Sequence, residues 1–356
     1  MKKLIATLVL LLSLTPLVNA QETPEVSPQR ISEYIQWYPA IKQAEMRDDW
    51  LEDFEQGQWQ FTGKVSADDR TVITPQADVN YGYTWFNISE KLVIITMPDY
   101  EYYYSASIFD MNHFMEVVVG PEKPIVVRLA NQKSPVEDAY EIVLETNQGL
   151  VFTRQTIVNN EAEVLKLAKE ITINGGGGDR PFIVPDFSEE EIAAGNAIIQ
   201  DYGMKISNAR KLFGSTNEGV GDLDRAAGVF LGQLGTQAYV VEYAQYVKDQ
   251  SGQALNGTDS YEITVPAKAL SKNEKGYWSL TIYNMEDRYL IPNEENRYVI
   301  SSYKAKKNAD GTVTLRINPE GKGENALPTA GKAFYGVFRV YEPVQGLEFP
   351  SIEKVN

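Results

Sequence analysis

The 356-residue chain contains no cysteine and a single histidine, His113. The lack of cysteine excludes disulfides, thiol nucleophiles, zinc–thiolate sites and iron–sulfur clusters. A Ser-His-Asp triad could use only His113 as its base, and no Gly-x-Ser-x-Gly sequence accompanies it. We therefore interpret His113 as a turn residue with local hydrogen bonds. A metal site built from His113, Asp110 and other carboxylates is the alternative.

Positive charge is also scarce, with 33 Lys and Arg against 49 Asp and Glu and a formal net charge of -16. An acidic surface repels phosphates and anionic headgroups, which argues against nucleic acid and membrane surfaces as partners. A small-molecule ligand and a homo-oligomer both remain compatible with this composition. The sequence indicates no particular cofactor.

Long apolar runs are absent after the first residues of the chain. Lys2 and Lys3 precede a mostly apolar stretch at 4–18, and Ala20 provides a small residue for cleavage. This layout predicts a secretory signal peptide and a periplasmic or secreted protein. A membrane anchor is the weaker alternative, because Pro16 interrupts a run already shorter than the roughly 20 residues that a spanning helix needs.

Strand patterns dominate two parts of the chain. Alternating or short apolar runs, separated by turn residues, are typical of an antiparallel sandwich or barrel. We expect strands at 79–85, 92–95, 102–109, 114–119, 125–129, 140–144 and 150–156, then at 261–265, 277–283, 297–302, 313–317 and 334–341. Asp310 and Gly311 predict a hairpin turn between two of these strands.

Helical spacing appears before and between the two strand-rich parts. Residues 28–54 predict two short helices, because Pro39 interrupts the pattern. Further helices are expected at 160–171, 188–206 and 222–249. The four glycines at 175–178 lack the Gly-Lys-Ser/Thr continuation of a phosphate loop and predict a flexible linker.

Aspartates and aromatic residues gather in the first strand-rich part. Tyr81 and Trp85 share one face of a strand, and Asp78 lies just before it. Aromatic rings beside a carboxylate could stack on a sugar or another ring ligand. They could equally belong to a core, with the hydroxyl groups at its edge.

Several motifs resemble two families of unknown function. The segment 69–89, which includes "DRTVITPQADVNY", resembles the signature of domain of unknown function (DUF) family 1254, and Tyr103 and Arg154 fall in its later blocks. The sequence "GYWSLTIYN" around Trp278 and the closing "RVYEP" at 339–343 resemble the companion DUF family 1214. The resemblance implies two β-domains joined by helices, and it implies no established reaction.

Together these patterns predict a mainly β protein with helical segments. Its two β-sandwich domains, immunoglobulin-like and then jelly-roll-like, would be joined by a helical connector. The expected parts are a signal peptide at 1–20, a helical segment at 21–60, a first domain at 61–173, a connector at 174–255 and a second domain at 256–356.

Three functions remain open. The first is binding of a small or carbohydrate-like ligand, with the candidate residues Tyr81, Trp85, Tyr103, His113, Arg154 and Trp278. The second is a carboxylate-based hydrolase or lyase, with Asp78 and Asp110 as acid/base candidates and metal assistance as an option. The third is an envelope structural or interaction protein.

Overall fold

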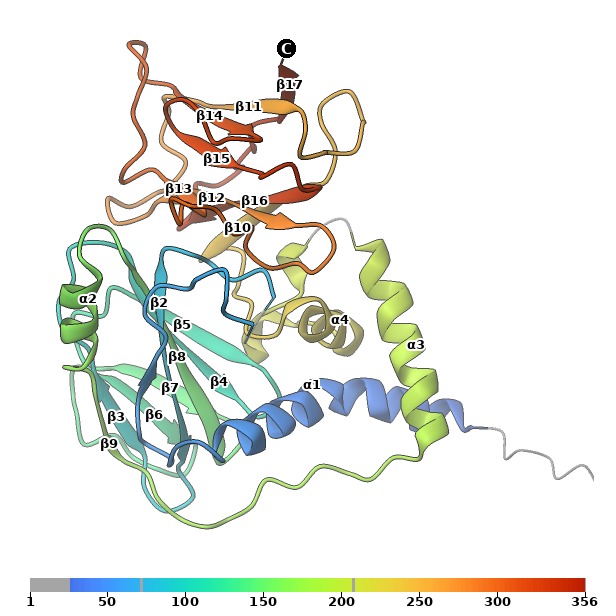
Figure 1. Cartoon of the computed structure of the whole chain (residues 1–356). Helices are drawn as coiled ribbons and strands as arrows, with labels where there is room; N and C mark the ends of the chain where they lie inside the picture. Colours follow the sequence, from blue (N-terminus) through green and yellow to red (C-terminus); the bar gives the residue numbers. More distant parts are fainter. Residues whose placement is uncertain (1–25, 71–72, 207–208, 356) are drawn as a thin grey trace, which may run out of the picture.

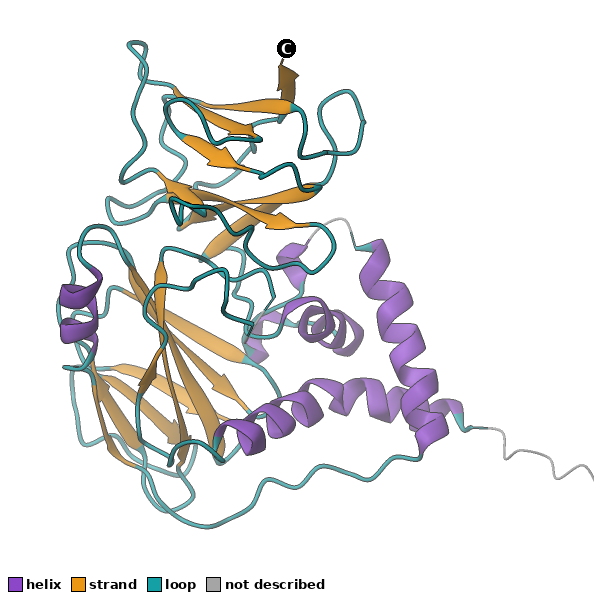
Figure 2. Cartoon of the chain, in the orientation of Figure 1, coloured by secondary structure: helices purple, strands orange, loops and turns teal. Residues whose placement is uncertain are grey.

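The computed structural model describes residues 26–70, 73–206 and 209–355, which form two β-sandwich domains with a group of helices beside the first (Figures 1 and 2). The predicted leader at 1–20 lies outside the described residues. Within the described part, none of the helices combines the length and the apolar character needed to cross a bilayer.

The first domain pairs a five-stranded sheet with a four-stranded sheet. The larger sheet has the order β1 (Gln60–Phe61), β2 (Val79–Asn87), β8 (Gln148–Thr156), β4 (Tyr104–Asp110) and β5 (Met115–Val119). The smaller has the order β7 (Tyr140–Leu144), β6 (Ile125–Leu129), β3 (Val93–Thr96) and β9 (Thr172–Gly175). Alternate residues of the strands fill a core between the two sheets, mainly with Ile and Val.

The second domain also has two sheets. One has the order β10 (Val241–Tyr246), β16 (Phe334–Tyr341), β12 (Trp278–Asn284) and β13 (Val299–Ser301). The other has the order β15 (Ala326–Pro328), β14 (Val313–Asn318), β11 (Ser260–Val265) and β17 (Glu353–Val355). A large apolar core between them makes this domain a separate packing unit.

The prediction of two β-sandwich domains joined by helices is therefore confirmed. The sheets are not wholly antiparallel, because β6 pairs with β7 and β14 pairs with β15 in parallel. The predicted hairpin at Asp310 and Gly311 is wrong, since the turn connects β13 and β14, which belong to different sheets. Gly311 has a φ of 84°, so the turn itself forms as expected.

Three longer helices, α1 (Pro28–Trp50), α3 (Glu189–Lys205) and α4 (Asp222–Gly232), pack on one another beside the five-stranded sheet (Figure 2). The short helix α2 (Glu161–Ala168) begins at Asn160, whose side chain accepts a hydrogen bond from the Ala162 N–H. Ser188 and Glu191 form the expected capping box of α3.

The prediction of two helices at 28–54 is wrong, because α1 continues through Pro39. A proline inside a helix removes a hydrogen bond and costs about 3 kcal/mol. Tyr34 and Tyr38 bury their rings against Ile199 of α3 and Val229 of α4. This tertiary packing outweighs the local cost.

The prediction of one helix at 222–249 is also wrong. The helix α4 ends at Gly232, Leu234 adopts a φ of 66°, and the chain then forms strand β10. Residues 240–246 are rich in β-branched and aromatic side chains, which favour a strand once β16 is available as a partner.

The glycine run at 175–178 is not a flexible linker, as the sequence had suggested. The Gly176 N–H donates to the Leu92 carbonyl at 3.0 Å, and the Gly177 N–H donates to the Asn87 carbonyl at 2.8 Å. All four glycines have positive φ, and a Cβ on Gly175 would lie 2.2 Å from the Leu92 oxygen. Glycine is required here by close backbone approach.

Candidate functional site

The outer face of the five-stranded sheet carries a row of three polar residues. Tyr81 on β2 pairs with Arg154 on β8, and Arg154 pairs with Ser105 on β4. Tyr81 packs against an apolar cluster that includes Tyr283 and Val337 of the second domain. This row therefore faces the second domain.

The second domain presents a matching row from its nearer sheet. Tyr243 on β10 pairs with Arg339 on β16, and Arg339 pairs with Ser279 on β12. Each domain thus contributes one tyrosine, one arginine and one serine, in the same order across its strands. Burial raises the pKa of Tyr81, whereas the positive charges of Arg154 and Arg339 act against this rise. Tyr81 therefore interacts electrostatically with an arginine from each domain.

Stacked tyrosines close one end of this contact. The ring of Tyr277 stacks on Tyr341 at 4.3 Å and on Tyr303 at 4.9 Å, and Tyr103 of the first domain lies 4.7 Å from Tyr341. Burial raises the pKa of Tyr103, Tyr277 and Tyr341 above the ordinary value. Their phenol groups therefore stay neutral and can donate hydrogen bonds at pH 7.

Asp78 lies at the same contact, directly before β2. Its Oδ1 accepts a 2.5 Å hydrogen bond from Gln76 Nε2, which also donates to Ser279 Oγ at 2.7 Å. Gln76 therefore ties the Asp78 segment to the second domain. Burial raises the pKa of Asp78 to about 6, although Gln76 and Arg339 both favour the charged form.

We define the inter-domain cluster by the residues that meet here: Asp78, Tyr81, Tyr103, Ser105, Arg154, Tyr243, Tyr277, Ser279, Arg339 and Tyr341. Four of the eight residues expected from the sequence belong to it: Asp78, Tyr81, Tyr103 and Arg154. The other four, Trp85, Asp110, His113 and Trp278, lie elsewhere.

Neither of the two buried arginines of the cluster forms an ion pair with a described residue. Among the described residues, no carboxylate oxygen lies within 4.0 Å of either guanidinium. Arg154 donates to Ser107 Oγ at 2.9 Å and to the Leu234 carbonyl. Arg339 uses its Nη2 to donate to the Thr74 carbonyl at 3.2 Å and to the Tyr283 hydroxyl at 3.0 Å.

Several buried polar atoms of the cluster have no hydrogen-bond partner among the described protein atoms. They are Asp78 Oδ2, Tyr103 OH, Ser105 Oγ, Tyr277 OH and Arg339 Nη1. Tyr103 interacts with Ser105, and Tyr277 with Tyr341, but neither contact has the geometry of a full hydrogen bond. Buried polar atoms in folded proteins nearly always have a partner, which can be protein, ordered water or a ligand. The inter-domain cluster is therefore the strongest candidate for a functional site.

Asp110 and His113 serve a different part of the first domain. Asp110 Oδ1 accepts from the Phe114 N–H at 2.9 Å and so fixes the turn between β4 and β5. His113 Nε2 accepts from the Leu234 N–H at 3.2 Å, and its φ is 64°. Burial lowers the pKa of His113 to about 3 and raises that of Asp110 to about 7.

The structure does not bring Asp78 and Asp110 together. Asp110 pairs with Gly149 of β8, whereas Asn80, two residues after Asp78, pairs with Gln155. Six residues of a strand span about 20 Å, so the two carboxylates cannot reach one substrate atom. A mechanism that uses them as a pair is excluded by this register.

Trp85 and Trp278 both fill cores. Trp85 is fully buried among apolar residues where α1 covers the five-stranded sheet. Trp278 stacks on Phe338 at 5.5 Å inside the second domain. Neither ring can contact a ligand held by the inter-domain cluster.

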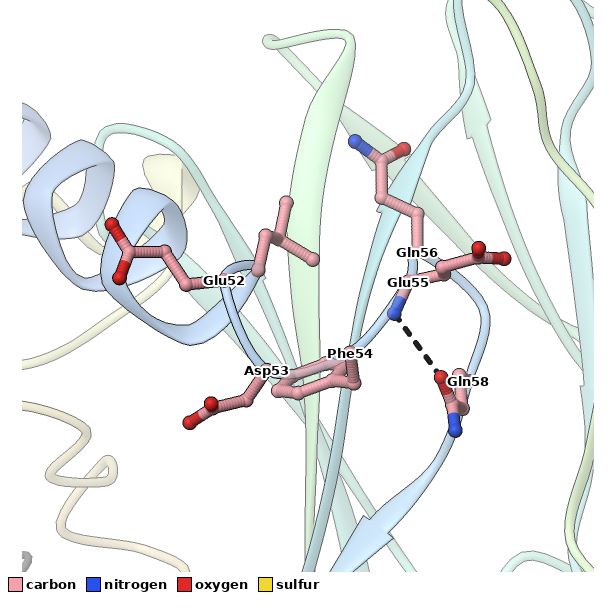
Figure 3. A pocket seen from close by; sticks show the side chains of 7 residues that line it. Glu52, Asp53, Phe54, Glu55, Gln56 and Gln58 are labelled. Carbon is pink, nitrogen blue, oxygen red and sulfur yellow. Dashed lines mark hydrogen bonds between the residues drawn. The ribbon is translucent and has the colours of Figure 1, made fainter.

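The described residues also form shallow surface hollows away from the cluster, one of them at residues 51–58 after α1 (Figure 3). The Glu55 N–H donates to Gln58 Oε1 at 3.1 Å and closes its turn. The carboxylates of Glu52, Asp53 and Glu55 point away from one another in Figure 3. They do not converge on a ligand, so this hollow is not a site.

Sequence reasoning missed the second-domain half of the cluster. The signal was present, because residues on adjacent positions of a strand point to opposite sides. Trp278 points into the core, so its neighbours Tyr277 and Ser279 must face the first domain. The same alternation places Arg339 and Tyr341 on the inter-domain face of β16.

Comparison with known proteins agrees with the two-domain division. Residues 58–174 match the family model described as protein of unknown function (DUF1254), and residues 241–345 match protein of unknown function (DUF1214). No curated protein matches the chain.

Solved structures with the same fold include the VPA0106 protein from Vibrio parahaemolyticus, at 18% identity and a TM-score of 0.73, with 92% of this chain and 99% of that chain covered. A putative uncharacterized protein from Burkholderia cenocepacia aligns at 13% identity and a TM-score of 0.53, with 94% and 92% covered. At these identities the likeness shows the fold alone.

Proposed function

We propose that this chain, whose residues 58–174 match DUF1254 and whose residues 241–345 match DUF1214, is an exported protein that binds a small polar ligand between its two β-sandwich domains. The observation that carries the proposal is the gathering of five buried polar atoms without a well-formed hydrogen bond in the inter-domain cluster, above all the charged atoms Asp78 Oδ2 and Arg339 Nη1. They come from both domains, so a ligand that satisfies them would contact both.

Leaving these atoms without hydrogen bonds costs the folded protein free energy. Each buried polar group without a hydrogen bond costs about 1–3 kcal/mol, and a charged group costs more. An interface between two domains could be made of apolar side chains at a lower cost. Keeping Asp78 and Arg339 there is most readily explained by a bound molecule that needs them.

The arrangement favours recognition by hydrogen bonds over ring stacking. Tyr277 already stacks on two other rings, and Tyr103 packs on Tyr341. These ring faces are therefore covered by protein. A carbohydrate-like ligand would be held through its hydroxyl groups.

An acid–base enzyme is the second candidate, and a single observation favours it. Asp78 has a raised pKa of about 6, and its Oδ2 is free of protein partners. A carboxylate with this pKa can exchange a proton near neutral pH. This version uses Asp78 alone, without Asp110, and predicts activity that depends on a group titrating near pH 6.

Export rests on the leader sequence. A basic start, an apolar run and Ala20 support cleavage near that residue, followed by a periplasmic or secreted location. Expression of the complete chain in a Gram-negative host, followed by fractionation and mass spectrometry of the N-terminus, tests this. A cytoplasmic product that retains residues 1–20 would contradict export.

Ligand binding is tested by thermal unfolding of the chain that starts at Gln21, with a broad panel of small metabolites. A ligand that binds only the folded state must raise the melting temperature. The same panel is applied to the double variant Tyr103→Phe/Tyr277→Phe and to Tyr140→Phe, a control on β7.

The proposal expects at least one compound that stabilises the parent chain and the control, with a smaller shift in the double variant. Two results would contradict it. One is the absence of any shift across the panel. The other is a crystal structure in which the five atoms bind only ordered water, even in the presence of the stabilising compound.

A further inference from the structure

We infer that the ligand is a small hydroxylated carboxylate, with its acid group at Arg339 Nη1 and a hydroxyl group at Asp78 Oδ2. This inference rests on the proposed function and specifies its ligand class. The two atoms are the charged members of the unpartnered set, and they require opposite kinds of partner.

The first step concerns Arg339, whose side chain is fixed but not satisfied. The residue is 5% exposed, and its Nη2 is held by Thr74 and Tyr283. Its Nη1 points at no protein acceptor. A guanidinium cannot lose its charge in a protein, so burial creates a demand for an anion.

Another buried arginine shows how the protein itself can neutralise such a charge. Arg225 is 6% exposed and pairs with Asp222 at 2.9 Å. Arg154 and Arg339 have no such carboxylate within the described part of the chain. The missing negative charge is therefore specific to the inter-domain cluster.

The charged groups of the cluster leave one positive charge uncompensated. Arg154 and Arg339 contribute two positive charges, and ionised Asp78 contributes one negative charge. Glu342 and Lys304, which act on the cluster from its margin, carry opposite charges that cancel. A ligand with one carboxylate and neutral hydroxyl groups brings the sum to zero, whereas a zwitterionic amino acid would leave it positive.

The third step concerns the neutral donors and acceptors. Asp78 Oδ2 needs a donor, which a ligand hydroxyl supplies. Tyr103, Ser105 and Tyr277 carry hydroxyl groups that can both donate and accept. Such a set matches a molecule with several hydroxyl groups better than an apolar acid.

The Arg339 guanidinium lies close to a partly exposed side chain. Tyr243 is 40% exposed, and its ring lies 5.9 Å from the Arg339 guanidinium carbon. It belongs to β10, the edge strand of its sheet. We therefore place the entry of a ligand toward Arg339 at Tyr243.

The test is isothermal titration of the chain from Gln21 with two acids and their neutral counterparts at equal ionic strength. The acids are D-galacturonate and D-gluconate, and the counterparts are D-galactose and D-sorbitol. We expect at least one acid to bind, and to bind at least tenfold more tightly than its counterpart, because a charge-assisted bond to Arg339 is lost with the carboxylate.

Three variants locate the effect. Arg339→Gln should weaken the acid at least tenfold, and Asp78→Asn, which keeps an acceptor for Gln76, should weaken it by removing the acceptor for the hydroxyl. Arg316→Gln changes an arginine paired with Glu262 in the same domain and should leave binding unchanged. Circular dichroism confirms that each variant is folded, and Asp78→Asn remains informative if Arg339→Gln does not fold.

The outcomes separate the two levels of the argument. If neither acid binds, or if both sugars bind as tightly as the acids, the carboxylate inference is overturned. If the metabolite panel nevertheless yields a neutral or cationic ligand that depends on Tyr103 and Tyr277, the proposed function stands without it. If no compound of any charge binds, both are overturned.

Discussion

Removing the Tyr277 hydroxyl should stabilise the unliganded protein. Tyr277→Phe keeps the stacked ring and deletes a buried hydroxyl that interacts with Tyr341 but forms no well-formed hydrogen bond. Leaving a neutral polar group unsatisfied costs about 1–3 kcal/mol, so its removal should raise the free energy of unfolding by about 1 kcal/mol. Tyr103→Phe should behave in the same way, because its hydroxyl interacts with Ser105 but also lacks a well-formed hydrogen bond.

Tyr283→Phe is the matched control for this experiment. Tyr283 lies on the same face of β12, but its hydroxyl donates to the Pro75 carbonyl at 2.7 Å and accepts from Arg339 Nη2 at 3.0 Å. Its removal leaves a buried carbonyl and a guanidinium N–H unpaired. We expect a loss of about 1–3 kcal/mol, opposite in sign to Tyr277→Phe.

Guanidinium chloride unfolding, followed by circular dichroism and tryptophan fluorescence, measures both variants under one protocol. A change of 1 kcal/mol corresponds to a shift of about 2–4 °C in a thermal scan of a domain of 150–250 residues. Should Tyr277→Phe destabilise the protein as much as Tyr283→Phe does, its hydroxyl has a partner in the free protein. The reasoning from unpartnered atoms would then fail.

Three further outcomes follow from the titrating and gating residues. Burial raises the pKa of Asp78 to about 6 in the folded state, so its contribution to stability is complete below the unfolded pKa near 4 and is lost as the pH rises through 6. Asp78→Asn should remove this loss and make the protein more stable at pH 7.5, by up to about 3 kcal/mol. Urea unfolding of both proteins at pH 4 and pH 7.5 measures the difference, and a difference that does not depend on pH would contradict the reasoning. Burial lowers the pKa of His113 to about 3, so its contribution to stability is present above pH 6.5 and is lost as the pH falls. His113→Gln can still accept from the Leu234 N–H and should reduce the loss of stability at low pH. Parallel acid-unfolding curves for the two proteins would count against this. Tyr243→Ala should accelerate association of the ligand at least threefold in stopped-flow fluorescence. Tyr289→Phe should not, because Tyr289 lies outside the inter-domain cluster with its ring against Arg70. Equal rates in all three proteins would refute gating by Tyr243.

The positions of the strands could be predicted from the sequence because they depend on local alternation of apolar and polar residues. Alternation and turn residues located β6, β7 and β16 at their observed bounds. The sheet partners were not readable, since they depend on contacts between distant residues. The parallel pairing of β6 with β7 therefore could not be derived from either strand alone.

The helices show where local preference loses to tertiary contact. Pro39 should interrupt α1, yet Tyr34 and Tyr38 before it and Ile41 after it pack in one apolar cluster with residues of α3 and α4. Residues 241–246 fit a helical stripe when read alone. They form a strand because β16 offers six paired positions along its edge.

The candidate site was half predictable for a related reason. Asp78, Tyr81, Tyr103 and Arg154 stood out because they lie in distinctive motifs of one domain. Arg339 could not be linked to them, because nothing local indicates that two residues 261 positions apart face each other across a domain contact. Only the packing of one sheet on the other brings Asp78 and Arg339 into one electrostatic environment.

This division also explains why the site requires both domains. Each sheet supplies a Tyr–Arg–Ser row whose arginine forms no ion pair with a described residue, and Gln76 of the first domain reaches Ser279 of the second. Two buried positive charges brought close together repel each other, and ionised Asp78 compensates for only one of them. The contact between the domains is therefore electrostatically incomplete, and an anion placed in the cluster would stabilise the contact while being bound by it.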